Sequence, residues 1–211
     1  MPRPFLYVLA GVNGAGKSSI GGHLLRQAGL DWFNPDSYAR ELVGQLGLAQ
    51  SEANGQAWQE GMRRLHHALH HGRNHAFETT LGGRSISAAL HEASATHDVL
   101  VWFCGLASPE QHLARVQARV EAGGHAISEA DIRRRYPAAQ ANLVALMPVL
   151  AQLQVYDNSA DAGPGDAIPD PVPVLQMEAG RLCWPAADDL AQLQRAPRWA
   201  TPLLEAALRL S

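Results

Sequence analysis

The chain carries Gly-Val-Asn-Gly-Ala-Gly-Lys-Ser at residues 11–18, which fits G-x-x-x-x-G-K-[ST] at every required position. A short apolar run rich in strand formers precedes it at residues 5–10, and a helical spacing of apolar residues follows it. A glycine-rich turn between a strand and a helix N-terminus aims backbone N–H groups and the helix dipole at one place. The segment therefore predicts a phosphate-binding loop with a nucleoside triphosphate as its ligand.

Side chains of this loop have distinct expected roles. The ammonium group of Lys17 would lie near the β- and γ-phosphates, and the Ser18 hydroxyl would hold a magnesium ion. ATP and Mg²⁺ are therefore the predicted cofactors. The residues expected to contact the nucleotide are Gly11, Asn13, Gly14, Ala15, Gly16, Lys17, Ser18 and Ser19. The alternative, a chance glycine turn before a helix, requires all four pattern positions to match by accident.

The composition describes one ordinary globular chain. It has 211 residues, of which 46% are hydrophobic and 18% charged, and its formal net charge is −3. This charge argues against a general affinity for nucleic acid. Two cysteines without metal-binding spacing, no signal-peptide pattern and no long apolar run lead us to expect a cytoplasmic protein without a membrane segment.

Segments with strand character alternate with segments of helical periodicity, which is typical of a parallel sheet covered by helices. We predict strands at residues 5–10, 31–33, 75–79, 99–104 and 153–156. We predict helices at residues 17–27, 52–71, 85–94, 109–122 and 128–150, with one more beginning at Pro35. Pro137 and Pro148 are expected to kink or interrupt the long helix. The expected fold class is α/β, with a mostly parallel five-stranded sheet flanked by helices.

The C-terminal part of the chain has a different pattern. Residues 157–173 concentrate Asp, Gly and Pro, which is typical of a surface loop. Two short strands at 174–178 and 181–184 flank Ala179-Gly180 and predict a hairpin, and a last helix is expected at 202–210. We therefore divide the chain into a P-loop core at 1–160, a flexible loop at 161–173, and a hairpin and helix at 174–211 that pack on the core.

Two carboxylates follow predicted strands, at the edge of a parallel sheet where ligands bind. Asp36 follows the second strand and is the candidate general base, because a kinase base must reach a hydroxyl of the acceptor. Glu78 ends the third strand and is expected to contact magnesium or the acceptor. The alternative for both residues is a structural one, in which Asp36 or Glu78 caps a helix.

Several motifs of other nucleotide-binding proteins are missing. The sequence contains no Asn-Lys-x-Asp segment that would read guanine. The apolar strand at residues 99–104 ends in Cys104 and Gly105, so it supplies no Walker B carboxylate. These absences favour a small kinase over a GTPase or a mechanical ATPase.

Two groups of arginines are candidates for a phosphate clamp. Arg115 and Arg119 are four residues apart on one predicted helix, and Arg133, Arg134 and Arg135 lie in the first turns of the next. The two helices flank Gly123-Gly124. We expect one arginine from each group to contact the transferred phosphate. The alternative is a solvated helix face, which is the commoner fate of arginine.

Taken together, these segments resemble the zeta-toxin family. The resemblance rests on residues 11–19, on Asn34-Pro35-Asp36-Ser37-Tyr38-Ala39, on Phe77-Glu78-Thr79-Thr80-Leu81, and on Arg119 followed by Gly123-Gly124-His125 and Ile132-Arg133-Arg134-Arg135-Tyr136. These segments occur in the family's order over residues 3–157. The chain is most similar to the short chromosomal "predicted ATPase" branch.

The resemblance implies an adenylate-kinase-like P-loop fold and ATP-dependent phosphorylation of a nucleotide-sugar hydroxyl, UDP-N-acetylglucosamine being the known toxin substrate. It assigns Lys17 and Ser18 to ATP and Mg²⁺, Asp36 to the base, Glu78 to the site and metal, and Arg119 to the phosphates. It also implies an antitoxin protein as a partner. A second arginine of the plasmid toxins falls near His125 here, so its role has either passed to Arg133 or Arg134 or been lost.

Two classes of function remain open from the sequence. The first is a metabolite kinase, toxic or not. The second is a nucleotide-binding regulatory or interaction protein that hydrolyses ATP slowly. Asp36 discriminates between them, because a kinase needs a base aimed at an acceptor hydroxyl and a switch does not.

Overall fold

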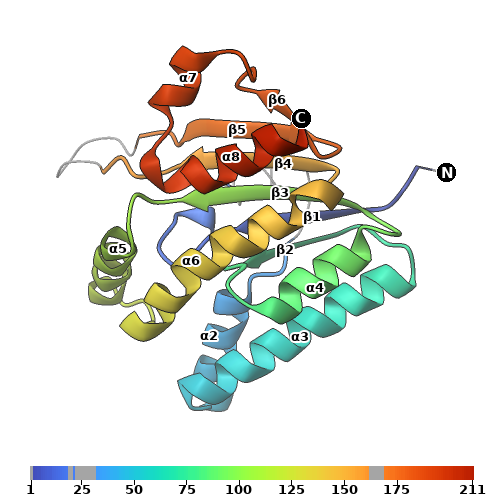
Figure 1. Ribbon diagram of the computed structural model, residues 1–211. Helices are drawn as coiled ribbons and strands as arrows, with labels where there is room; N and C mark the ends of the chain where they lie inside the picture. Colours follow the sequence, from blue (N-terminus) through green and yellow to red (C-terminus); the bar gives the residue numbers. More distant parts are fainter. Residues whose placement is uncertain (1, 19–20, 22–31, 162–168) are drawn as a thin grey trace.

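The computed structural model describes residues 2–18, 21, 32–161 and 169–211. Within these residues the chain forms one six-stranded sheet with the order β2-β1-β3-β4-β5-β6 (Figure 1). The first four strands are parallel, and the last two are antiparallel to their neighbours. The strands are β1 (Phe5–Ala10), β2 (His75–Thr79), β3 (Asp98–Gly105), β4 (Gln152–Asp157), β5 (Val172–Glu178) and β6 (Arg181–Trp184).

Helices connect the parallel strands: α2 (Pro35–Leu46) and α3 (Gln50–His70) lie between β1 and β2, α4 (Arg84–Ala93) between β2 and β3, and α5 (Pro109–Glu121) and α6 (Glu129–Leu146) between β3 and β4. Two further helices, α7 (Leu190–Arg195) and α8 (Thr201–Leu210), follow β6. Figure 1 shows α4, α6 and α8 side by side on one face of the sheet, where they bury its apolar side chains. No helix among the described residues has both the length and the apolar composition needed to cross a bilayer.

The predicted α/β class is confirmed, with one difference in the sheet. The hairpin of β5 and β6 does not pack beside a five-stranded sheet but extends it, because β5 pairs along the whole of β4. The predicted strand at 31–33 is reduced to a single bridge between Phe33 and Phe77, while its residue 31 lies outside the described residues. The helix α7 was not predicted from the sequence.

Local sequence explains where several helices begin. The side chain of Asn34 accepts a hydrogen bond from the backbone N–H of Ser37, and Pro35 occupies the first turn of α2. Ser108 and Ser128 cap α5 and α6 in the same way. The helix α6 continues through Pro137 and ends at Leu146, so the expected interruption occurs only near Pro148.

The parallel register brings the functional segments to one edge of the sheet. Ala10 at the end of β1 is paired with Thr79 of β2 and with Phe103 of β3, and β3 continues alongside β4 as far as Asp157. The loops that follow these four strands therefore leave the sheet at the same edge, where ligands of open parallel sheets bind.

Candidate active site

The loop at residues 11–18 has the backbone that phosphate binding requires. Gly11, Gly14 and Gly16 have φ values of 140°, 86° and 85°, which disfavour any residue with a side chain. A Cβ atom at Gly11 would also overlap the carbonyl oxygen of Cys104 in β3. The predicted helix after the loop begins at Lys17, and most of its remainder, including Ser19, lies outside the described residues. The loop thus has the conformation of a nucleotide-binding loop.

Buried side chains support this loop from behind. His112 of α5 donates from Nδ1 to the carbonyl oxygen of Asn13 at 2.8 Å, and burial lowers the pKa of His112 to about 4. Arg135 of α6 donates to Oδ1 of Asn13 at 2.8 Å, and Asn13 itself is only 3% exposed. Asn158 donates to the carbonyl oxygen of Ala15 at 2.9 Å. Three separate elements therefore fix the loop before any ligand binds.

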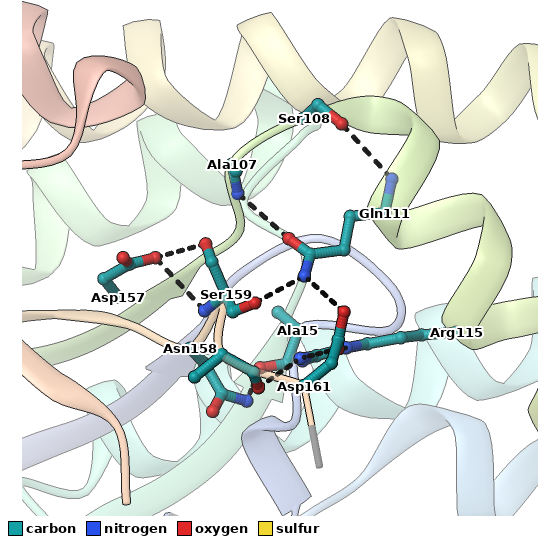
Figure 2. A network of polar contacts seen from close by, with 10 residues as sticks. Ala15, Ala107, Ser108, Gln111, Arg115, Asp157, Asn158, Ser159 and Asp161 are labelled. Carbon is teal, nitrogen blue, oxygen red and sulfur yellow. Dashed lines mark hydrogen bonds and ion pairs between the residues drawn. The ribbon is translucent and has the colours of Figure 1, made fainter. Parts of the chain in front are cut away.

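Figure 2 shows the polar network beside the loop, which joins α5 to the segment after β4. Gln111 donates to the carbonyl oxygen of Ser159 at 2.6 Å and to the carboxylate of Asp161 at 3.1 Å. Arg115 forms an ion pair with Asp161 at 2.7 Å and donates to the carbonyl oxygen of Ala160. Arg115 is therefore held in this network, whereas Nη1 of Arg119 in the same helix lies 3.9 Å from Oδ2 of Asp36.

Glu78 lies at the end of β2 and connects the loop to the neighbouring chain segment. It is only 5% exposed. Its Oε2 accepts a hydrogen bond from Ser18 Oγ at 3.1 Å, and its Oε1 accepts one from Trp32 Nε1 at 3.0 Å. The next helix, α4, begins after Gly83 without a side-chain cap. Glu78 therefore does not cap that helix, and its carboxylate is directed at the loop.

The pairing of Ser18 with Glu78 fits a magnesium site. Both groups offer oxygen ligands, which Mg²⁺ prefers, and such sites take only one or two protein ligands besides phosphate and water. Among the described residues no cluster of three or more His, Cys, Asp or Glu side chains could bind a metal. A magnesium ion at this place would therefore rely on Ser18, Glu78 and the nucleotide's own phosphates.

Asp36 lies in the first turn of α2. The cap of this helix is Asn34, so the alternative in which Asp36 serves as the cap is wrong. Its Oδ2 is 3.9 Å from Nη1 of Arg119 and 3.7 Å from Nε2 of His125. Arg119 and His125 come from α5 and the linker that follows it. The fold thus places a carboxylate opposite two cationic or titratable groups.

A cavity of about 340 Å³ lies between the loop and α3 and reaches Asp36. Lys17, Asp36 and Glu78 are among its charged lining residues. Apolar side chains also line it, among them Met62 and Trp58, of which the latter is 52% exposed. A second cavity, of about 790 Å³, is lined by residues of α2 and of the linker after α5, and Asp36 lines it as well. Asp36 therefore stands where the two cavities meet.

The three consecutive arginines of α6 lie in different surroundings. Arg133 forms ion pairs with Glu110 and Glu129, both at 2.7 Å, and lines neither cavity. Arg134 lines the smaller cavity and is paired with Asp131 at 2.6 Å. Arg135 lines that cavity too and contacts the nucleotide loop at Asn13.

Arg135 therefore contacts the loop directly, whereas Arg133, which was expected to bind the nucleotide, faces away. Arg133 is instead paired at 2.7 Å with Glu129 of its own helix and with Glu110 of α5.

Sequence reasoning missed several residues of the site. His112 and Asn158 donate to backbone carbonyl oxygens of the loop, and no local motif marks them. Arg135 was one of the three candidates in its group, but its contact with Asn13 was not singled out. His125 was noted only as the position where an arginine of the zeta toxins falls. Of these residues, only Asn34 could have been predicted from the sequence, because Asn before Pro is a typical start of a helix. Its side-chain Nδ2 also donates to Ser18 Oγ at 3.3 Å.

The fold and the loop define a P-loop nucleotide-binding protein with a kinase-like architecture. The sequence pattern of the AAA domain family AAA_33 matches residues 6–139, which is more than half of the chain. The chain therefore belongs to this family. A comparison with curated protein sequences finds no match.

Solved structures with the same fold include a two-protein complex with ATP and a toxin–antitoxin system. The AvrRxo1-ORF1:AvrRxo1-ORF2 complex with ATP aligns with 93% of this chain at 16% identity and a TM-score of 0.63, and this chain spans 64% of that chain's length. A chain of the PezAT chromosomal toxin–antitoxin system of Streptococcus pneumoniae aligns at 17% identity and a TM-score of 0.56. The alignment covers 74% of this chain and 68% of the PezAT chain. At these identities the likeness confirms the zeta-toxin-like fold.

Proposed function

We propose that this protein is an ATP-dependent kinase that phosphorylates a hydroxyl group of a small molecule. The observation that carries the proposal is the position of Asp36, which lines one cavity together with Lys17 and is not a helix cap. A general base must lie within reach of both the acceptor and the transferred phosphate. In this assignment Asp36 accepts the hydroxyl proton as the acceptor oxygen attacks the γ-phosphorus.

The nucleotide would be held by the loop. Gly11, Asn13, Gly14, Ala15 and Gly16 would surround the phosphates with backbone N–H groups, and Lys17 would contact the β- and γ-oxygens. Ser18 and Glu78 would hold Mg²⁺, which supplies positive charge to the phosphate oxygens when bound. Arg119 would stabilise the charge of the migrating phosphoryl group.

The acceptor would occupy the cavity of about 340 Å³, whose size suits a small ligand. The exposed indole of Trp58 offers an apolar face to a planar or sugar ring, and Arg134 lies at the same cavity for an anionic group. A nucleotide sugar related to UDP-N-acetylglucosamine has both features. We propose this class of acceptor, which the resemblance to the zeta toxins also supports.

We further propose that the kinase acts as a toxin and is neutralised by an antitoxin protein. The support is the shared fold, because the PezAT structure is described as a toxin–antitoxin system and AvrRxo1-ORF1 was crystallised with AvrRxo1-ORF2. Expression of the chain alone should then slow growth of a bacterial host, and the Lys17→Ala variant should not. Equal growth of both cultures would contradict toxicity without affecting the kinase assignment.

The second candidate function is a nucleotide-binding regulator with slow ATPase activity. It is favoured by the well-supported loop, which needs no acceptor to bind ATP. The Asp36→Asn variant separates the two candidates, since the amide keeps the size of the side chain but cannot act as a base.

The experiment is a transfer assay with γ-labelled ATP and a panel of UDP-sugars and other metabolites. If the protein is a kinase, Asp36→Asn should leave the affinity for an ATP analogue nearly unchanged and reduce acceptor phosphorylation by roughly 10²- to 10⁴-fold. Glu52→Gln, an exposed carboxylate in the first turn of α3, is the matched control and should behave like the wild type. Full activity of Asp36→Asn, or labelled phosphate released only to water, would contradict the proposal.

A further inference from the structure

His125 lies in the linker between α5 and α6 and faces Asp36 across the larger cavity. Its Nε2 is 3.7 Å from Asp36 Oδ2, and only 9% of its side chain is exposed. The same carboxylate oxygen is 3.9 Å from Nη1 of Arg119. Arg119 also fixes the linker, because its Nη2 donates to the backbone carbonyl oxygen of His125 at 3.1 Å. One oxygen of Asp36 therefore lies between an imidazole and a guanidinium group, somewhat beyond hydrogen-bond distance of both.

The surroundings of His125 determine its charge. Burial lowers the pKa of His125 below its ordinary value, and the guanidinium groups of Arg119 and Arg40 lower it further. The carboxylate of Asp36 acts in the opposite direction and raises the pKa. Glu41 of α2 and Arg64 of α3 line the same cavity, and Arg64 is already paired with Glu60 at 2.7 Å. The lowered pKa leaves the imidazole neutral at pH 7.

We propose that His125 is a positioning residue for the phosphoryl transfer, an inference that rests on the kinase function proposed above. Neutral His125 and cationic Arg119 hold Oδ2 of Asp36 and leave Oδ1 to receive the acceptor proton. The acceptor oxygen bonds to the γ-phosphorus, the bond from that phosphorus to the ADP oxygen breaks, and the hydroxyl proton moves to Oδ1. Correct orientation of the base is what His125 contributes.

This arrangement predicts how activity depends on pH. When His125 takes up a proton, it becomes a cation beside Asp36, and the resulting ion pair makes the carboxylate a weaker base. Activity is therefore fully present above the pKa of His125 and is lost as the pH falls through it.

The first test is the pH profile of kcat for the wild type, His125→Gln and His91→Gln. His91 is an exposed histidine of α4 and serves as the control. We expect His125→Gln to lower kcat by about tenfold at pH 7, to change the KM for ATP less than twofold, and to shift the acidic loss of activity to lower pH. A profile identical to that of the wild type would overturn the inference and leave the kinase function intact.

The second test needs no acceptor. The pKa of His125 is measured by NMR in the wild type and in Asp36→Asn, with His91 as an internal reference. The pKa of His125 should fall when the carboxylate is replaced, because Asp36 raises it in the wild type. An unchanged pKa would overturn the inference. A wild-type protein that phosphorylates no acceptor would instead overturn the proposed function, and the role in transfer with it.

Discussion

The side chains that support the nucleotide loop and the side chains around Asp36 differ in how closely they contact their partners. Behind the loop, hydrogen bonds of 2.8–2.9 Å come from His112, Arg135 and Asn158, and the groups they reach are buried. Around Asp36 the corresponding contacts are 3.7–3.9 Å long, and Asp36 and Arg119 are 41% and 36% exposed. The difference shows that the nucleotide loop is preorganised, whereas the contacts around Asp36, the proposed acceptor half, are longer than hydrogen bonds.

This comparison has a physical reason. A phosphate chain is recognised by backbone N–H groups, whose directions depend on the loop conformation, so the loop must be fixed in advance. An acceptor must enter and leave, and catalytic contacts often tighten only when the substrate is bound. The predictions below test each half separately.

The largest effect is expected for Lys17→Ala in the preorganised half. Removing the ammonium group takes away charge that stabilises the developing negative charge on the phosphates, so transfer should fall on the order of 10³-fold. Circular dichroism should show an intact fold, because the loop is held by other residues. Transfer at the wild-type rate would show that this loop is not the active site.

A smaller loss is expected for Arg119→Ala in the open half. A clamp on the migrating phosphoryl group acts mainly in the transition state, so kcat should fall by about 10²-fold while the affinity for ATP changes little. Arg119→Lys, which keeps the charge but loses the planar fork, should recover only part of the rate. Equal losses in ATP binding and kcat would make Arg119 a ground-state contact instead.

Arg135 and Arg133 of α6 should differ in their effect on ATP binding. Arg135→Ala removes the donor to Asn13 and should raise the KM for ATP by about tenfold, since a hydrogen bond from a charged group is worth roughly 1.5–3 kcal/mol. Arg133→Ala breaks only exposed ion pairs, which contribute little, and should stay within twofold of the wild type. A larger rise in the KM for ATP for Arg133→Ala than for Arg135→Ala would show that Arg133 is the arginine that acts on the nucleotide.

The last effect concerns the stability of the fold in acid. The folded-state pKa of His112 is about 4, below the ordinary value of 6.5, because the imidazole is buried. The unfolded chain therefore binds more protons between these values. Stability is complete above pH 6.5 and decreases toward pH 4, by at most about 1.4 kcal/mol per pH unit from this group.

Urea unfolding at several pH values measures this dependence. The His112→Asn variant can still donate to Asn13 but does not titrate, so its stability should vary less between pH 6.5 and pH 4. A variant with the same pH dependence as the wild type would show that other groups cause it.

Much of the fold could be predicted from the sequence because its signals are local. The strand that becomes β3 is apolar throughout, and α5 and α6 each begin at a serine that caps them. The hairpin was predicted as well, from the turn residues Ala179 and Gly180. Its addition to the edge of β4 was not, because strand pairing between distant segments leaves no mark in either segment alone.

The sequence by itself determined the loop at residues 11–18 and the strand and helix on either side of it. Each glycine there meets a backbone requirement that is encoded within eight residues. It also placed Asp36 and Glu78 after predicted strands, and the parallel sheet then brings them to one edge.

Only the tertiary structure decided which arginine of residues 133–135 reaches the loop, which side chains support Asn13 and Ala15, and that His125 faces Asp36. The residues in these contacts are far apart in the sequence: the separation is 89 positions for Asp36 and His125, 122 for Asn13 and Arg135, and 143 for Ala15 and Asn158. Contacts across such separations depend on how whole elements pack, and packing is a property of the folded chain rather than of any one segment.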